Sequence, residues 1–410
     1  MSNSYYSGKL NNVFVSSSTY PKVNLSLLLK DDPNQRSFQS PNLYRKSLLK
    51  IPNIIYERKK LINSYFKSGI YERSSKIDDV HFMTMASKPV DVEIDYKKSI
   101  TSNTLVYDKQ NIDLPVPKYN PMNSFKITGN ASLIKPVEKI YYDKDITAMD
   151  AYSTLYNKLD IYRMIDMFSV GVFGKKLNKK IVPTKWSITA NDDITSTKFL
   201  NNIRDYRQIS SYEIYYSNYL GNHYVTLLFP REWSYELFEF GVDGVIKSPF
   251  DSGKISSRLL ERFKGVKSSY DKMAKLSSTK TNDSKYLLNN YSTDYESYYG
   301  RKNYAVNCAG GYYAARYSLS RFLNDRKKQA SALVLRFVDK TYNTPMGVWV
   351  CREASNFSMS KCIGFFDDFD KAMSNLLDFV KELGIINLDD ILKKSLLLNF
   401  HKYQKRITDF

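Results

Sequence analysis

Cysteine and histidine are scarce in this sequence of 410 residues. The three cysteines, Cys308, Cys351 and Cys362, are irregularly spaced and form no CxxC element, and only three histidines could join them as metal ligands. So small and scattered a set is not expected to build a disulfide framework or a structural zinc site. We therefore expect no metal of this kind.

Long hydrophobic runs are also missing. No stretch approaches the ~18 uninterrupted apolar residues that a membrane-spanning helix needs, and residues 1–10 lack the apolar core of a signal peptide. The sequence therefore predicts a soluble, cytoplasmic protein without a membrane partner.

Basic residues are in excess, with 61 Lys and Arg against 42 Asp and Glu, which leaves a net charge of +19. Such a field favours polyanionic partners such as nucleic acid or an anionic membrane surface, and its size alone does not choose between them. With DNA as the partner, the protein would be nucleoid-associated. The alternative is codon bias, because Lys, Asn and Tyr are all abundant in proteins from AT-rich genomes. Hydrophobic residues make up 42% of the chain, enough to bury a core, so disorder is excluded as the dominant state.

The spacing of apolar residues predicts both helices and strands. Helices are expected at 148–168, 252–275, 312–323, 367–383 and 391–400, and strands at 223–229, 333–338 and 346–351. The last two strands are expected to form a hairpin across a turn that contains Asn343 and Pro345. The predicted fold is α+β, with mixed or antiparallel sheet elements packed with amphipathic helices and a flexible C-terminal tail.

Shifts in composition divide the chain into segments. The expected segments are an extended N-terminal lead-in at 1–50, an α+β region at 51–276, an exposed connection at 277–299, a second α+β region at 300–386 and a C-terminal tail at 387–410.

The segment 89–97 alternates strictly between apolar and charged residues. As a strand it would place Asp91, Glu93, Asp95 and Lys97 on one face. Carboxylates beside a lysine could hold Mg²⁺ and orient a water for phosphodiester cleavage. The same alternation is typical of a half-buried strand whose charged outer face protects the sheet. Asp91 and Glu93 are therefore candidates for a catalytic site, and Mg²⁺ is the cofactor it would use.

Two adjacent carboxylates, Asp192 and Asp193, follow the segment 183–190. Ser187 or Thr189 could form a helix cap with Asp192, and Asp192 could equally be a metal ligand. Both carboxylates join the candidate catalytic residues of an alternative function, a metal-dependent nuclease or related DNA-processing enzyme.

A glycine pair at 310–311 stands where a helix is expected to begin, with basic and aromatic residues around it. The first turn of a helix offers free amide N–H groups to a phosphate, and tyrosines can stack on an unpaired base. Close packing of the helix against a sheet explains the same residues equally well. The candidate nucleic-acid-binding residues are Arg301, Lys302, Tyr312, Tyr313 and Arg316.

The last seven residues, 404–410, fit the Q-x-x-h-x-x-aromatic pattern of peptides that bind sliding clamps. Gln404 can hydrogen-bond at the rim of a pocket while one helical turn projects Ile407 and Phe410 into it. A chain end is also where a tethered docking peptide can reach its partner. Ordinary chain ends contain the same residue types, so the pattern alone does not decide.

Five stretches of the chain carry a resemblance to a known family. They are Tyr20-Pro-Lys-Val23, Ser87-Lys-Pro-Val-Asp-Val-Glu93, Val182-Pro-Thr-Lys-Trp-Ser-Ile-Thr-Ala-Asn-Asp-Asp193, Gly300-Arg-Lys with Gly310-Gly-Tyr-Tyr-Ala-Ala-Arg316, and Pro345-Met-Gly-Val-Trp-Val-Cys-Arg-Glu353. Together and in this order they resemble the archaeal Nre family of DNA repair proteins. Lys185 replaces an expected Arg and Asn191 an expected Val.

The resemblance implies a part in repairing DNA damage and a C-terminal motif that docks on the sliding clamp, PCNA. Gln404, Ile407 and Phe410 occupy the motif positions, with one terminal aromatic where many clamp motifs have two. The N-terminal cysteine cluster of some relatives is missing here, so the resemblance implies no metal at that end. It also supplies no active site. We therefore expect a repair protein with PCNA and DNA as its partners.

Overall fold

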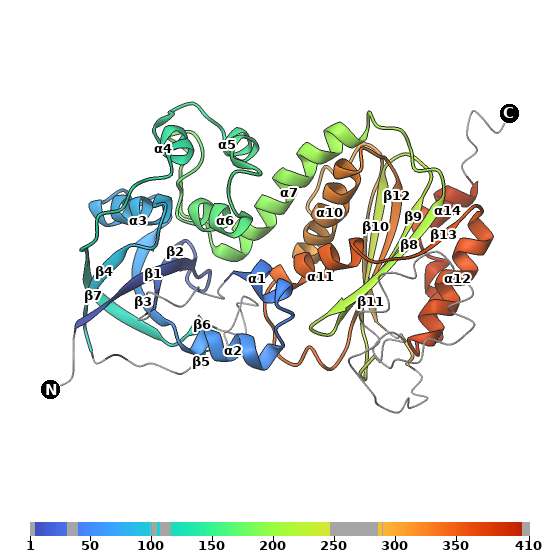
Figure 1. Cartoon of the computed structure of the whole chain (residues 1–410), viewed down its shortest axis with the longest axis horizontal. Coiled ribbons are helices and arrows are strands. Elements are labelled where there is room, and N and C mark those ends of the chain that lie inside the picture. The colour runs from blue at the N-terminus through green and yellow to red at the C-terminus, as the bar shows by residue number, and fades with distance from the viewer. Residues whose placement is uncertain are drawn as a thin grey trace. The chain divides into compact units, whose positions relative to one another are not determined.

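The computed structural model of the chain describes residues 5–30, 40–98, 100, 105–106, 116–246, 286–288 and 290–403 (Figure 1). The chain divides into two compact units: unit 1 comprises Met1–Thr195 and Thr344–Trp349, and unit 2 comprises Ser196–Asn343 and Val350–Phe410. Both units contain helices and strands, which confirms the α+β class. The helix predicted at 252–275 lies outside the described residues. Within the described ranges, no helix is long and apolar enough to cross a membrane.

Unit 1 is built around a closed barrel in the strand order β1-β2-β3-β7-β4. These strands are β1 (Tyr5–Val15), β2 (Lys22–Lys30), β3 (Ile62–Gly69), β4 (Asp91–Tyr96) and β7 (Tyr119–Ile127), and the short strands β5 (Leu105–Val106) and β6 (Val116–Pro117) pair separately. In β2, Val23, Leu25, Leu27 and Leu29 are all fully buried, because residues two apart share one face of a strand. The barrel interior is therefore a packed apolar core.

Seven helices are described wholly or partly in unit 1. They are α1 (Pro41–Lys46), α2 (Ile51–Lys59), α3 (Ser75–Met85), α4 (Lys135–Tyr142), α5 (Ala148–Leu155), α6 (Ile161–Ser169) and the first part of α7 (Thr184–Ile203). The single helix predicted at 148–168 is in fact α5 and α6. The chain breaks between them because Asn157 has a positive φ of 67° and Asp160 caps the start of α6.

The N-terminal segment differs from the extended lead-in predicted at 1–50. Its β1 and β2 are barrel strands, and its Tyr44 in α1 is fully buried. The alternating apolar residues of β2 would have shown this, because a strand that buries every second side chain belongs to a sheet rather than to a lead-in.

Unit 2 contains a six-stranded mixed sheet in the order β11-β10-β12-β9-β8-β13. The strands are β8 (Tyr212–Tyr219), β9 (Asn222–Phe229), β10 (Ser234–Gly241), β11 (Tyr291–Glu296), β12 (Ser331–Val338) and β13 (Cys362–Phe366). Only β10 and β12 run parallel among these neighbours. The predicted strands at 223–229 and 333–338 are confirmed as β9 and β12.

Helices cover both faces of this sheet (Figure 1). One face carries α10 (Ala309–Asp325) and α11 (Trp349–Met359), and the other carries α12 (Phe369–Glu382) with α14 (Leu396–Tyr403) and the short α13 (Leu388–Leu392). Leu376, Phe379 and Val380 of α12 pack into the apolar core on the second face. The helices predicted at 312–323 and 367–383 are therefore confirmed.

The strand predicted at 346–351 is wrong. Gly347 has a positive φ of 93°, α11 begins at Trp349, and both edges of β12 are already occupied by β9 and β10. A short run of buried apolar residues fits a helix start as well as a strand, so periodicity could not distinguish them.

The C-terminal region from 387 is mostly not a tail. Leu388, Ile391 and Leu397 are buried in the core of unit 2. The buried carboxylate of Glu236 in β10 accepts hydrogen bonds from Ser395 Oγ at 2.5 Å and from the backbone N–H of Leu397 at 3.0 Å. Glu236 thus fixes the start of α14 to the sheet, and only 404–410 lie outside the described residues.

Candidate functional site

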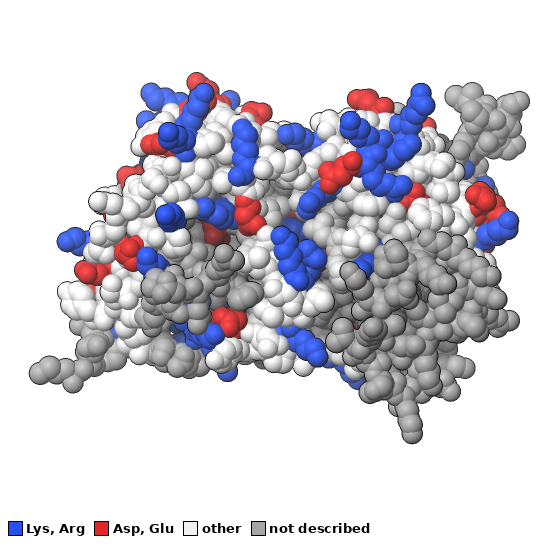
Figure 2. All heavy atoms as spheres, viewed as in Figure 1, with Lys and Arg blue, Asp and Glu red and all other residues white. Residues whose placement is uncertain are grey.

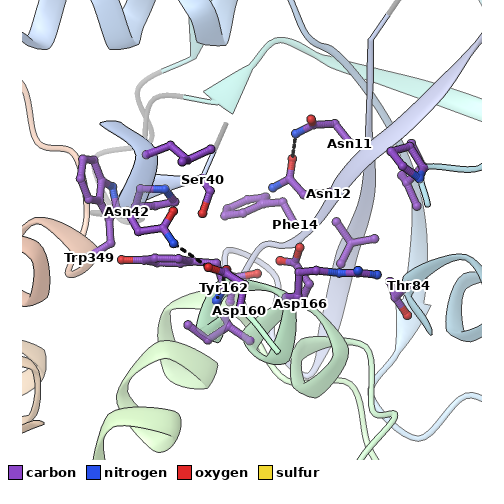
Figure 3. A pocket seen from close by; sticks show the side chains of 18 of the residues that line it. Asn11, Asn12, Phe14, Ser40, Asn42, Thr84, Asp160, Tyr162, Asp166 and Trp349 are labelled. Carbon is purple, nitrogen blue, oxygen red and sulfur yellow. Dashed lines mark hydrogen bonds between the residues drawn. The ribbon is translucent and has the colours of Figure 1, made fainter. Parts of the chain in front are cut away.

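Unit 1 contains a cavity of about 450 Å³ beside the barrel (Figure 3). It is lined by residues of β1, α1, α2, α3, α6, the first turns of α7 and the segments 86–89 and 347–349, all of which belong to unit 1. In Figure 3, Phe14 and Asn12 of β1 lie on one side of the space, and Tyr162 and Asp166 of α6 lie on the other. A volume of this size is within the range of natural ligand pockets.

Asp160 has a structural role at this cavity. Its Oδ1 accepts the backbone N–H of Tyr162 at 2.9 Å, which caps α6, and its Oδ2 accepts a hydrogen bond from Asn42 Nδ2 at 2.6 Å. Both oxygens of this carboxylate are therefore engaged by the protein.

Asp166 has a different environment. Burial raises the pKa of its carboxyl well above the usual range. The guanidinium groups of Arg163 and Arg58 lower this pKa, whereas the Asp160 carboxylate raises it further. Asp166 is half-buried and belongs to the cavity lining. A carboxyl of raised pKa in a cavity is a typical functional-site residue, because its protonated form persists to higher pH than that of an ordinary carboxyl.

Four residues of the lining carry a buried polar atom that has no hydrogen-bond partner among the described residues. These atoms are Ser40 Oγ, Asn42 Oδ1, Arg58 Nε and Trp349 Nε1. A buried polar atom without a partner costs about 1–3 kcal/mol. Both hydrogen-bond donors and acceptors are among these buried atoms of the lining residues.

Three of the stretches that carry the family resemblance meet at this cavity. Its lining takes residues 87–89 from the second stretch, Thr184 and Ile188 from the third, and Gly347 and Trp349 from the last. Thr184 Oγ1 also accepts a hydrogen bond from the backbone N–H of Val15 at 2.9 Å, which ties α7 to β1. Segments far apart in sequence therefore build one site.

A second cavity of unit 1, of about 420 Å³, lies between α3 and α4 and the segments 70–73, 142–144 and 176–181. Its basic lining residues are Arg73, Lys144, Lys176, Lys179 and Lys180. Lys179 Nζ donates a hydrogen bond to the carbonyl oxygen of Tyr141 at 2.8 Å and lies 4.2 Å from the centre of the Tyr141 ring. Burial lowers the pKa of Lys179 to about 8.

The alternating segment 89–97 forms β4 as predicted, and its apolar residues face the barrel core. Its carboxylates lie on the outer face, where Asp91 pairs with Lys9 at 3.5 Å, Asp95 accepts a hydrogen bond from Asn123 at 3.0 Å, and Glu93 is exposed. This arrangement matches the structural interpretation of the alternation, that of a charged outer strand face.

Asp192 and Asp193 lie in the middle of α7, so the predicted capping role is wrong. The helix begins at Thr184, and the hydroxyls of Ser187 and Thr189 donate to carbonyl oxygens of the preceding turn. Asp192 is fully buried and Asp193 is half-buried. Among the described residues, no three His, Cys, Asp or Glu side chains are grouped so that they could hold a metal ion.

The candidate nucleic-acid residues on α10 are mainly buried. Tyr312 OH donates to Glu296 Oε2 at 2.8 Å, and Arg316 Nε donates to Glu296 Oε1 at 3.1 Å, where Trp233 Nε1 also donates at 2.8 Å. Tyr313 is 6% exposed. In this arrangement the tyrosines cannot stack on a base, so the structure favours the close-packing interpretation.

The two basic residues before α10 differ from each other. Arg301 pairs with the Asp294 carboxylate at 3.1 Å and donates to the carbonyl oxygen of Tyr295 at 2.8 Å. Lys302 is exposed. Of the predicted nucleic-acid residues, Lys302 is thus the one that presents its charge to solvent.

Unit 1 has a pair of exposed aromatic rings that contact each other. Tyr20 and Trp186 are 46% and 43% exposed and contact each other edge to face, with ring centroids 4.9 Å apart. Lys185 Nζ lies 5.8 Å from the centre of the Trp186 ring, and Lys22 is exposed nearby in sequence. Tyr20 and Trp186 come from two of the stretches that carry the family resemblance.

Gln404, Ile407 and Phe410 lie outside the described residues. The described residues end at Tyr403, which is also the last residue of α14. The predicted clamp motif therefore follows, in sequence, a helix that is fixed to the sheet of unit 2.

Asp160 and Asp166 were not among the residues predicted from the sequence. The available signal was a carboxylate within the apolar helix 161–169, where Met164, Ile165 and Met167 are buried. An acidic residue in such a helix must have a partner, a shifted pKa or a cavity beside it.

Together, the barrel, the mixed sheet and the cavity define a two-unit α+β protein with a mainly apolar cavity, which also has polar residues in its lining, beside its barrel. The model of the family described as Archaeal Nre, N-terminal matches residues 2–245, and the model described as Archaeal Nre, C-terminal matches residues 296–410. The chain belongs to the archaeal Nre family, which confirms the resemblance seen in the sequence. The first cavity takes residues from both matched regions.

Three relatives match most of the chain. A protein named DNA repair protein NreA from Archaeoglobus fulgidus is 28% identical over 363 residues, covering 88% of this chain and 82% of the relative. The NreA of Haloferax volcanii is 26% identical, covering 96% and 86%, and a DNA repair protein NreB of A. fulgidus is 26% identical, covering 94% and 87%. No solved structure matches the chain.

Proposed function

We propose that this protein acts in DNA repair, binds DNA directly and is recruited to the sliding clamp PCNA by its last seven residues. The names of its relatives support the repair role. The observation that carries the DNA contact is the exposed aromatic pair of Tyr20 and Trp186 beside basic side chains.

The distribution of charge between core and surface supports binding to a polyanion. Seven Asp or Glu side chains but only four Lys or Arg side chains are buried among the described residues. The surface is therefore more positive than the composition alone requires, and basic side chains are spread across the face shown in Figure 2. Such a surface attracts the phosphate backbone without regard to sequence.

The aromatic pair adds a contact for unpaired bases. Stacking of a base on an aromatic side chain contributes about 1–3 kcal/mol by alanine substitution and tolerates any base. Trp186 with Lys185 beside it offers both a ring and a positive charge. We therefore expect single-stranded DNA, or an unpaired region within a duplex, to be the preferred form.

Fluorescence anisotropy with a labelled single strand tests the DNA contact. We expect the affinity to fall steeply with salt, because several phosphate contacts release counterions, and Trp186→Ala to weaken binding about fivefold or more. Tyr142→Ala, which removes a ring that is 69% exposed elsewhere in unit 1, is the matched control and should bind normally. Salt-insensitive binding, or equal losses in the two variants, would defeat the proposal.

Calorimetry with PCNA tests the recruitment. Deleting 404–410, or changing both Ile407 and Phe410 to Ala, should abolish clamp binding, because these two side chains are the apolar anchors of the motif. Lys405→Ala should bind as the full chain does. The folded units should be unaffected, since the described structure of α14 ends before the deletion. Unchanged clamp binding by the truncated chain would refute recruitment through this segment.

The alternative of a metal-dependent nuclease gains no support from the carboxylates singled out in the sequence. Asp91 and Glu93 face outward from β4, while Asp192 is buried in α7. We therefore do not assign a catalytic step or a Mg²⁺ site to them.

A further inference from the structure

We propose that the cavity beside the barrel binds the uncharged base of a nucleotide that has been extruded from DNA, an inference that rests on the proposed DNA contact. Neither the family match nor the names of the relatives assigns a ligand to this cavity. Three features of its lining carry the proposal: its flat rings, its unpartnered hydrogen-bonding groups and its assembly from distant segments.

The rings supply the stacking surfaces. Phe14 of β1 and Tyr162 of α6 lie on opposite sides of the space in Figure 3, and Trp349 also belongs to the lining. Extruded bases are bound between aromatic and apolar side chains, so a planar heterocycle suits these walls.

The polar atoms supply the edge contacts. Arg58 is 3% exposed and Trp349 is 1% exposed, and each has a nitrogen donor with no partner among the described residues. Asn42 Oδ1 is a buried acceptor that also has no partner among the described residues. A nucleobase edge presents acceptors and donors side by side, so it can satisfy such a mixed set where a hydrocarbon ligand cannot.

The charged side chains of the lining are Asp160 and three basic residues, Arg58, Lys88 and Arg163, which together disfavour a metal ion or an amine. Asp166, whose carboxyl retains its proton above the usual pH, then has an O–H to donate and an oxygen to accept with.

Two sources could supply this chemistry, a base extruded from DNA or a free nucleoside, and two measurements separate them. The first is anisotropy with a labelled duplex that contains one T·T mismatch and with the same duplex fully paired. The wild-type chain should bind the mismatched duplex about tenfold more tightly, because extruding an unpaired base costs less. The second is calorimetry with free deoxythymidine.

Variants tie the effect to the cavity. Tyr162→Leu and Asp166→Ala should each reduce the mismatch preference at least about fivefold while leaving affinity for the paired duplex unchanged. Tyr71→Leu and Asp95→Asn, which alter a ring that is 63% exposed and a carboxylate on the outer barrel face, are matched controls and should keep the preference.

The outcomes are distinct. A mismatch preference lost only in the cavity variants supports the inference. Equal binding to both duplexes by the wild type, or a preference that survives in both cavity variants, overturns it and leaves the proposed DNA contact standing. Binding of deoxythymidine without a mismatch preference assigns the cavity to free nucleosides and overturns extrusion. Absence of binding to either duplex defeats the proposed DNA contact itself.

Discussion

Asn42 donates a hydrogen bond to Asp160 at 2.6 Å and so joins α1 to α6 across 118 positions of the sequence. Because the other oxygen of Asp160 caps α6, this carboxylate positions the helix that presents Tyr162 and Asp166 to the cavity. The two acidic residues of the cavity therefore have separate roles. Asp160 organises the wall, and Asp166 supplies the group with the shifted pKa.

Loss of the Asn42 amide should destabilise the wall. Asn42→Ala is expected to lower the free energy of unfolding by about 1.5–3 kcal/mol, the range for hydrogen bonds to charged groups. Urea unfolding measures it. Asn11→Ala, which removes a hydrogen bond to the neighbouring Asn12 in the same lining, should change it by no more than about 0.5 kcal/mol. Equal losses in the two variants would contradict the structural role of Asn42.

Asp166→Asn should raise stability at neutral pH. The folded-state pKa of Asp166 lies above its unfolded value, so the native state binds more protons, and its stability falls as pH rises from about 4 through the folded pKa. Asn cannot ionise and escapes this cost, about 1.4 kcal/mol for each unit by which the pKa is raised. Thermal unfolding from pH 3.5 to 8 should show a gain in Tm that grows with pH. A gain that is equal at both ends of the range would disprove the shift.

Lys179 should react as a free amine at unusually low pH. Its pKa of about 8 means that half of the side chains are neutral at that pH, and the neutral fraction grows as pH rises further. Acetylation followed by peptide mass spectrometry across pH 6.5 to 10 should give a midpoint near 8 for this residue, with no signal from Lys179→Arg. A midpoint near 10.5, the usual lysine value, would refute the effect of burial.

The buried pair of Arg316 and Glu296 should matter for folding rather than for DNA. Arg316→Ala leaves the Glu296 carboxylate buried without its ionic partner, which is expected to cost about 3–5 kcal/mol in unfolding free energy. Arg321→Ala on the same helix removes an exposed pair with Asp325 and should cost less than about 1 kcal/mol. Folded Arg316→Ala should bind DNA with the wild-type affinity, so a selective loss of DNA binding would restore this residue to the DNA surface.

Periodic segments could be predicted from the sequence because their burial pattern repeats locally. The strand β4 and the helices α10 and α12 are confirmed for this reason. The segment 346–351 could not be resolved, since one short apolar run fits both a strand and a helix start. Its structure is decided by long-range packing, with β12 already paired on both edges.

The functional residues were harder to predict than the elements. Tyr312, Arg316 and the glycine pair suit a phosphate site and a packed helix equally, and only the position of Glu296 in β11 decides between them. The cavity could not be predicted from the sequence, because the residues that line it are far apart in the chain. Asp166 is one polar residue in an apolar helix, and its significance depends on Arg58 and Trp349, which are distant in sequence.

The anchoring of α14 by Glu236 has a consequence for how the clamp would be approached. Gln404 follows Tyr403 directly in the sequence, so no further residues separate the proposed docking peptide, 404–410, from α14, which is hydrogen-bonded to the sheet through Glu236. Docking on the ring would then leave the protein little freedom to reorient relative to the clamp. Under the proposed recruitment, this protein would differ from proteins joined to a clamp through a long flexible linker, because it would be held in a nearly fixed orientation toward the DNA that passes through the ring.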